Sequence, residues 1–125
     1  MSDLRALVLR YFRGVDQQDI GLIFETLAED CVFSVETHGV TLTGHGEIGG
    51  MFERLWSHHA AVRHDQFHFV DAGNGVEIAV RFRVTNTLHD GSLVYKSNCN
   101  FFTAAGRFTE VRVYMAGENT LDRNR

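Results

Sequence analysis

Apolar positions recur at steps of three and four residues along the first part of the chain. Between Leu4 and Val15 they fall on one face of a predicted helix, and the same spacing returns between Ile20 and Leu27. A third helix is predicted over 47–56. Its apolar face consists of Ile48, Met51, Phe52, Leu55 and Trp56. The residues suited to cap the first two helices are Ser2 or Asp3, and Asp16 or Asp19.

The period changes to two after His58. Strands are predicted over 64–71, 76–85, 93–102 and 108–115, and the Asn-Gly and Asp-Gly pairs between them predict hairpin turns. In the strand over 76–85, the residues expected to face the core are Val76, Ile78, Val80, Phe82 and Val84. A short strand over 31–36 and a turn-rich connection over 37–46 precede the third helix. This order predicts an α+β fold, in which three helices cover one face of a curved, mostly antiparallel sheet.

Length and charge narrow the class of protein. The chain has 125 residues, which predicts one domain over 1–125. A net charge of −4 argues against binding to a nucleic-acid backbone. No apolar run approaches the ~18 residues of a membrane span, and the N-terminus has no signal-peptide pattern, so we expect a cytoplasmic protein. Cys31 and Cys99 have no metal-ligand spacing and are expected to be reduced, buried thiols, with no metal or cofactor.

The stretch LVYKSNCNFF, over 93–102, has an ambiguous orientation. One set of alternate positions is Leu93, Tyr95, Ser97, Cys99 and Phe101, and the other is Val94, Lys96, Asn98, Asn100 and Phe102. Alternation alone favours placing the lysine and the two asparagines in water. The other assignment makes this strand the polar wall of a cavity.

Three segments carry a family resemblance: RYFRGVDQQDIGLIFETLAEDCVF, LTGHGEIGGMF and GRFTEVRVYM. Their order and spacing resemble the nuclear transport factor 2-like superfamily, and within it the SnoaL-like polyketide cyclase and ketosteroid isomerase branch. The resemblance implies a cone-shaped sheet that curls around a pocket beneath the helices. Members of the family include isomerases, cyclases, dehydratases, epoxide hydrolases and pure binding proteins, so the fold alone does not settle the function.

The resemblance assigns roles to particular residues. Tyr11 falls at the position of the oxyanion-hole tyrosine of the isomerases, and Asn98 falls at that of the protonated aspartic acid that shares this hole. Val35 falls where the isomerases have their catalytic aspartate, so the usual base is missing. Related dehydratases and cyclases place a histidine near His64, which makes His64 the candidate base. A core tyrosine, an exposed strand asparagine and a solvated histidine are the plain alternatives for these three residues.

The resemblance also orients the strand over 93–102. It places Asn98 in the pocket, whose other expected lining residues are Val35, Phe52, Trp56, His68, Phe82, Val84, Lys96, Asn100, Val113 and Met115. The opposite face of the sheet would then be apolar. It would carry Leu93, Tyr95, Cys99, Phe101, Phe108 and Tyr114. An exposed apolar face of this kind usually marks an interface, and many family members dimerise through this sheet, so a homodimer is expected.

Two functions of different classes follow. The first is an isomerase, lyase or cyclase that acts by general acid/base chemistry on a small, apolar, carbonyl-bearing molecule. The second is a non-catalytic ligand-binding or dimerisation module of the same fold. The arrangement of the polar groups distinguishes them, because an enzyme must bring Tyr11, Asn98 and a titratable base around one enclosed volume.

Overall fold

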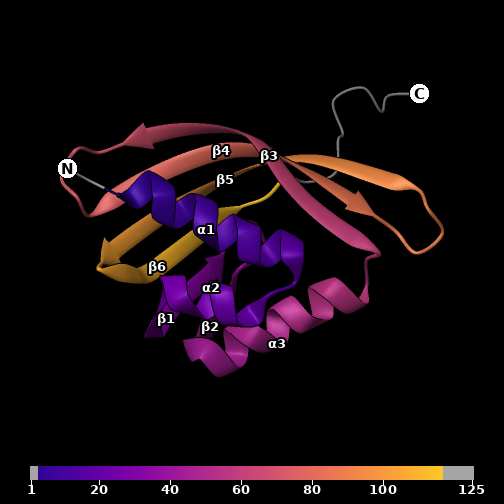
Figure 1. Cartoon of the computed structure of the whole chain (residues 1–125), viewed down its shortest axis with the longest axis horizontal. Coiled ribbons are helices and arrows are strands. Elements are labelled where there is room, and N and C mark those ends of the chain that lie inside the picture. Colours follow the sequence, from indigo (N-terminus) through magenta and orange to yellow (C-terminus); the bar gives the residue numbers. More distant parts are fainter. Residues whose placement is uncertain (1–2, 117–125) are drawn as a thin grey trace.

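The computed structural model describes residues 3–116, which form three α-helices packed on one six-stranded sheet (Figure 1). The helices are α1 (Leu4–Gln17), α2 (Ile20–Thr26) and α3 (Gly44–Ser57). The strands are β1 (Leu27–Val35), β2 (Val40–Thr43), β3 (Ala61–Asp71), β4 (Glu77–Thr87), β5 (Leu93–Ala105) and β6 (Arg107–Tyr114). A short 3₁₀ helix, η1 (Glu36–His38), joins β1 to β2. The predicted α+β class is confirmed.

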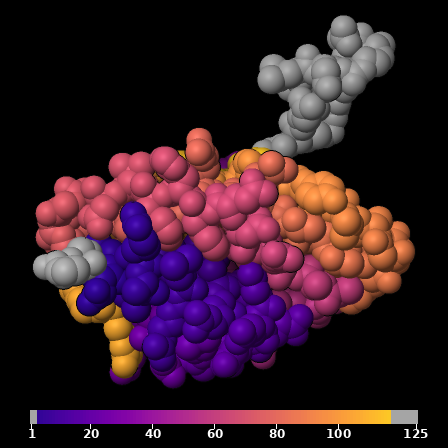
Figure 2. Space-filling view, turned by 45° about the horizontal axis from the view of Figure 1, so that its top comes forward, coloured from indigo at the N-terminus to yellow at the C-terminus, as the bar shows by residue number. Residues whose placement is uncertain are grey.

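The strands lie in the order β2-β1-β6-β5-β4-β3, and only the β1–β6 pair among them is parallel. The sheet is strongly curved and remains open, with the helices on its concave side (Figure 1). The far end of the β4–β5 hairpin, in orange, extends past the helices. In the space-filling view, α1 in indigo packs against the strands β3 and β4 (Figure 2). The concave face is therefore covered along part of its length only.

The core lies between α1 and the concave face of the sheet. Phe12 is its centre: its ring centroid lies 4.7 Å from that of Phe82 on β4 and 6.3 Å from that of Phe102 on β5. On α3, the ring of Phe52 lies 6.0 Å from that of Phe33 on β1. The amphipathic spacing of α1 and α3 thus places their apolar faces on the sheet, as the sequence predicts.

The orientation of β5 settles the ambiguity in its sequence. Asn98 and Asn100 are 6% and 2% exposed, whereas Tyr95 and Phe101 on the other face are 61% and 50% exposed. The orientation taken from the family resemblance is therefore confirmed. Lys96 shares the face of Asn98 but is only half-buried.

Three details of the predicted strands are wrong. The connection predicted over 37–46 contains β2, a four-residue strand that pairs with β1 and is too short for a clear period. Val76 precedes β4 and is exposed. Phe108 is buried against Phe102 instead of lying on the outer face. A register shift opposite Thr103 and Ala104 inserts one residue into β6 and reverses the alternation.

A close contact between α1 and α2 generates a prediction for stability. A Cβ atom at Gly14 would lie 2.7 Å from Cγ1 of Ile23, which is fully buried. Gly14→Ala should therefore lower the free energy of unfolding by about 1–3 kcal/mol, although alanine is the better helix former. Urea denaturation measures this difference.

Gly21→Ala on α2 is the matched control. Its new Cβ would meet only the Asp19 side chain, at 3.5 Å, which is an ordinary contact. This variant should be as stable as the parent or slightly more stable. Equal stability of both variants would contradict the packing described for α1 and α2.

Candidate functional site

A cavity of about 340 Å³ lies between α1, α3 and the concave face of the sheet. Most of its wall is apolar and includes the rings of Phe12, Phe33, Phe52 and Phe82. Its polar lining residues are Tyr11, His38, Arg54, His64, Asn98 and Asn100. The volume falls in the range of pockets that hold one small molecule.

Most of the residues predicted to form the site line this cavity. The structure brings together Tyr11, Asn98 and His64, from α1, β5 and β3. It also places on the wall Val35, Phe52, Phe82, Asn100, Val113 and Met115. Four predicted lining residues lie elsewhere: Trp56, His68, Val84 and Lys96.

His68 lies outside because β3 contains a bulge. Asp65 pairs with Arg83 and His68 with Arg81, so β3 uses one residue more than β4 over this interval. Gln66 has a φ of 56°, in the left-handed region that non-glycine residues rarely adopt. The extra residue turns His68 to the outer face, where it is exposed, while His64 stays on the inner face.

The other three exceptions have local causes. The indole N–H of Trp56 donates to the carbonyl oxygen of Val15 at 2.9 Å, which fixes the ring between α3 and α1. Val84 is buried, and it lies opposite His64 on one side and Lys96 on the other. Lys96 is one step of alternation beyond Asn98, toward the part of the sheet that extends past the helices.

His64 is held in place by Asp16 of α1. Nδ1 of His64 donates to Oδ1 of Asp16 at 2.5 Å, and the backbone N–H of His64 donates to Oδ2 at 2.9 Å. The imidazole also packs between two rings, with centroids 4.9 Å from Phe12 and 5.5 Å from Phe82. A proton fixed on Nδ1 leaves Nε2 as the basic nitrogen of the neutral ring, and no group within residues 3–116 bonds to it.

Four other histidines donate hydrogen bonds to backbone carbonyl oxygens. His45 donates to the carbonyl oxygen of Leu27 at 3.0 Å and stacks on Phe24. The other three donate to carbonyl oxygens at the end of α3, and they are His58, His59 and His89. Of the histidines in the described part of the chain, only His64 and His38 line the cavity.

Asn98 presents its amide nitrogen as a free donor. The backbone N–H of Ala116 donates to Oδ1 of Asn98 at 3.0 Å, and this bond identifies the oxygen because a backbone N–H can only donate. Nδ2 has no acceptor among the described residues. An unpaired N–H₂ group on the wall of a cavity is suited to bind a carbonyl or enolate oxygen.

Asn100 and Tyr11 are buried polar residues of the same wall. Oδ1 of Asn100 is buried and has no hydrogen-bond partner in the described structure. Tyr11 is 2% exposed, and its hydroxyl likewise bonds to no group of residues 3–116. Burial, followed by the charge of the Cys31 thiolate, raises the pKa of Tyr11 well above its ordinary value, so the phenol stays a hydrogen-bond donor. Unpaired buried polar groups cost free energy, which a bound ligand would recover.

Three parts of the site could not be anticipated from local sequence. Asp16 was expected as a helix cap, but Asp19 alone caps α2, with its carboxylate accepting from the N–H of Leu22 at 3.1 Å. Asp16 and His64 are 48 positions apart, so no local pattern joins them. Arg54 and His38 were also missed, and both line the cavity. Arg54 is not on the apolar face predicted for the third helix, and His38 lies in the connection predicted over 37–46.

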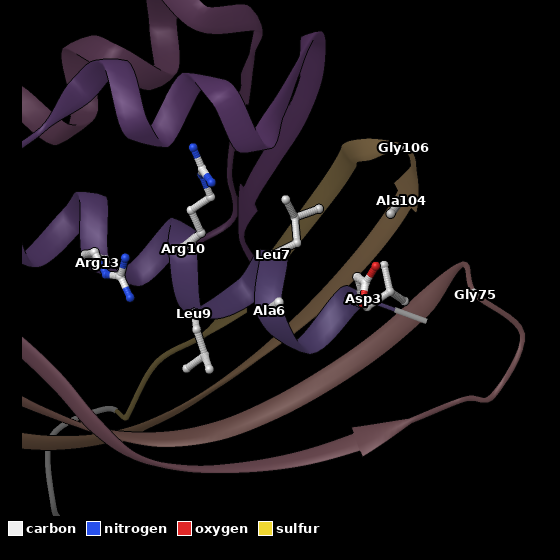
Figure 3. Close-up of a pocket in the computed structure, with 10 residues that line it drawn as sticks. Asp3, Ala6, Leu7, Leu9, Arg10, Arg13, Gly75, Ala104 and Gly106 are labelled. Carbon is white, nitrogen blue, oxygen red and sulfur yellow. The ribbon is translucent and has the colours of Figure 1, made fainter. Parts of the chain in front are cut away.

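A larger groove of about 670 Å³ lies along the outer side of α1 (Figure 3). Its polar side chains are Asp3, Arg10 and Arg13, and all three are exposed. Arg10 already pairs with Glu25. The groove offers no buried polar group, so the inner cavity is the better candidate site.

The described residues contain no group of three or more histidine, cysteine, aspartate and glutamate side chains placed to hold a metal ion. Cys31 and Cys99 are free thiols. Burial, followed by the charges of Asp30 and Glu110, raises the pKa of Cys31 to about 12. Cys99 is only half-buried, because it lies on the outer face opposite Arg81. No helix of residues 3–116 is long and apolar enough to cross a membrane.

Three helices on the concave side of a curved, open sheet define a small α+β fold. The chain belongs to the SnoaL-like domain family, whose model matches residues 8–115. A search of curated proteins found no match.

Solved structures show the same fold at low sequence identity. TerC, co-crystallised with polyporic acid, superposes with a TM-score of 0.81 at 17% identity, over 92% of each chain. A nuclear transport factor 2-like protein of unknown function from Burkholderia pseudomallei superposes with a TM-score of 0.80 at 19% identity, over 93% of this chain and 92% of that one. SalBIII is an epoxide hydrolase/cyclase-like enzyme with a role in pyran ring formation in salinomycin. It superposes with a TM-score of 0.77 at 20% identity, over 90% of this chain and 89% of that one.

The buried phenol of Tyr11 generates a prediction for alkaline pH. Its pKa is raised in the folded state, so above about pH 10 the unfolded chain binds fewer protons and stability falls as the pH rises. Tyr11→Phe removes this loss. The free energy of unfolding of the variant, relative to that of the parent, should therefore increase by about 1 kcal/mol between pH 10 and pH 11.

Urea denaturation at a series of pH values measures the effect. Below about pH 10 the difference in unfolding free energy between Tyr11→Phe and the parent should not change with pH. A difference that stays constant through the alkaline range for Tyr11→Phe would contradict the burial of its hydroxyl.

Proposed function

We propose that this protein catalyses proton transfer at a carbon next to a carbonyl group, in an isomerase, lyase or cyclase reaction on a small, largely apolar molecule. The single observation that carries the proposal is the pair of His64 and Asp16 beside a cavity that also contains the free donors of Tyr11 and Asn98. The pair supplies a base, and the donors supply a site for negative charge.

The mechanism follows from these positions. Nε2 of His64 removes a proton from the carbon, and Asp16 stabilises the imidazolium that forms. The electron pair moves onto the carbonyl oxygen, where the Tyr11 hydroxyl and the Asn98 amide donate to the developing enolate. His64 then returns the proton to another atom, which completes an isomerisation, or the enolate expels or attacks a group within the same substrate. Val35 occupies the position of the usual aspartate base, so we do not expect efficient steroid isomerisation.

The second candidate is a non-catalytic ligand-binding module. The largely apolar wall of the cavity favours it, because such a wall can bind a molecule without acting on it. TerC, a structural neighbour, was crystallised with a small molecule. Both candidates share a small apolar ligand, and both accord with the expected cytoplasmic location. Only the enzyme requires His64 in its basic form.

The catalytic proposal is tested by exchange of carbon-bound protons with deuterium. Cyclic ketones, enones and epoxides are screened first by NMR, for deuterium uptake or turnover, to find a substrate. His64→Gln should then lower the rate by about 10²–10⁴, because it removes the base. Tyr11→Phe and Asn98→Ala should each lower it by about 10²–10³. Circular dichroism checks that each variant is folded.

His68→Gln is the matched control, since His68 lies on the same strand but on the outer face and is exposed. Its rate should equal that of the parent. If His64→Gln is also as active as the parent, His64 is not the base. If a molecule binds in the cavity and neither exchanges nor reacts, the binding-module function is correct.

We also propose that the outer face of the sheet forms a homodimer. Leu93, Tyr95, Phe101 and Tyr114 are exposed there, and the rings of Phe101 and Tyr114 lie 5.7 Å apart. Contiguous exposed apolar side chains of this kind mark interfaces. A stable dimer would bury at least ~1,000 Å² in total.

Tyr95→Glu should convert the dimer into a monomer, because it places a charge within the apolar face. Analytical ultracentrifugation at micromolar concentration measures the mass. Leu9→Glu, at an exposed apolar residue of α1, is the control and should leave the dimer intact. A parent protein that sediments as a monomer would rule the dimer out.

A further inference from the structure

The wall of the cavity contains one permanently charged cation, Arg54, and no acidic side chain. Arg54 is permanently charged, His38 and His64 are titratable, and no aspartate or glutamate lines the volume. Asp16 does not line the cavity, and its carboxylate is paired with the imidazole of His64. The chain as a whole carries a net charge of −4, so the charge of the cavity lining is opposite in sign to the net charge of the protein.

The cation lies at the opening of the cavity. Among the lining residues, only His38, Val40 and Arg54 are exposed, and they therefore form its rim. They come from η1, β2 and α3. A molecule with its apolar body between the aromatic rings would place its outermost group beside Arg54.

Nearby carboxylates do not neutralise Arg54. Glu36, on the same short helix as His38, accepts from the Ser34 hydroxyl at 2.5 Å, and its charge acts on Arg112 of the outer face. Ser34 pairs with Arg112 in the sheet, so Glu36 is turned away from the rim. Glu53 is next to Arg54 in α3, where consecutive side chains point about 100° apart. The guanidinium has no ion pair within the described part of the chain.

We propose that the ligand of this cavity is a carboxylic acid with an apolar body, and that Arg54 binds its carboxylate at the rim. The inference rests on the proposed function, because it assigns a class of ligand to the same cavity. A guanidinium matches a carboxylate with two parallel hydrogen bonds, whereas a neutral group at this position receives a weaker bond. The positive rim also favours the approach of small anions to a chain that otherwise repels them.

The test compares cinnamate with cinnamamide, which have nearly the same shape and differ in charge. Both are titrated into the 125-residue protein at mildly alkaline pH, and binding is followed by NMR at the side-chain amides of Asn98 and Asn100. The parent should bind cinnamate about tenfold more tightly than cinnamamide, a modest ratio because Arg54 is exposed.

Arg54→Gln should bring the two affinities close to each other without weakening the binding of cinnamamide. Arg54→Lys should keep part of the preference, because it keeps the charge but loses the second hydrogen bond. Arg13→Gln is the matched control, since Arg13 is an exposed arginine on the outer side of α1, and it should keep the full preference.

The outcomes separate this inference from the proposed function. If both probes shift the amide signals with equal affinity, or if the preference survives Arg54→Gln, the role of Arg54 is wrong and the cavity remains a ligand site. If neither probe shifts these signals, the carboxylic acid inference is wrong and the cavity loses its support as a ligand site. A tenfold preference that disappears only in Arg54→Gln supports the inference.

Discussion

The burial of two amide side chains on β5 is the constraint on which the site depends. Asn98 and Asn100 lie on the concave face of the sheet, where apolar residues would let the helices pack directly on the strand. Buried amides need partners, and within residues 3–116 the protein provides only one, the N–H of Ala116. An apolar filling of this volume would leave the amides unpaired, whereas a bound molecule with polar atoms could supply the missing hydrogen bonds.

The chemistry of the cavity is assembled from residues that are distant in sequence. Asp16 at the end of α1 reaches His64 on β3, and Phe12, one turn earlier on α1, packs against the same imidazole. The position of α1 on the sheet therefore fixes both the location of the His64 ring and the nitrogen that carries its proton. The proposed base, His64, lies on β3, whereas Val35 on β1 contributes an apolar side chain to the wall of the cavity.

The sequence was sufficient for the fold and for most of the residues that line the candidate cavity. Long amphipathic helices and strands separated by Asn-Gly and Asp-Gly turns have clear periods, so the element order could be predicted. Tyr11, Asn98 and His64 could be selected because they match a family pattern. Two register shifts could not be predicted, since an inserted residue reverses the alternation without a mark in the sequence, and they misplaced His68 and Phe108. The pairing of Asp16 with His64 is a tertiary contact, which no local pattern encodes.

Trp56 is an intrinsic fluorescence probe next to the cavity. It is the only tryptophan in the sequence, its indole N–H bonds to α1, and its ring stacks on Phe52 with centroids 5.8 Å apart. Phe52 lines the cavity, so a molecule that enters displaces water next to the partner of the indole. The polarity around the ring then changes, and with it the emission spectrum. Ligands can therefore be sought through the intrinsic fluorescence of the unlabelled protein, before any reaction is known.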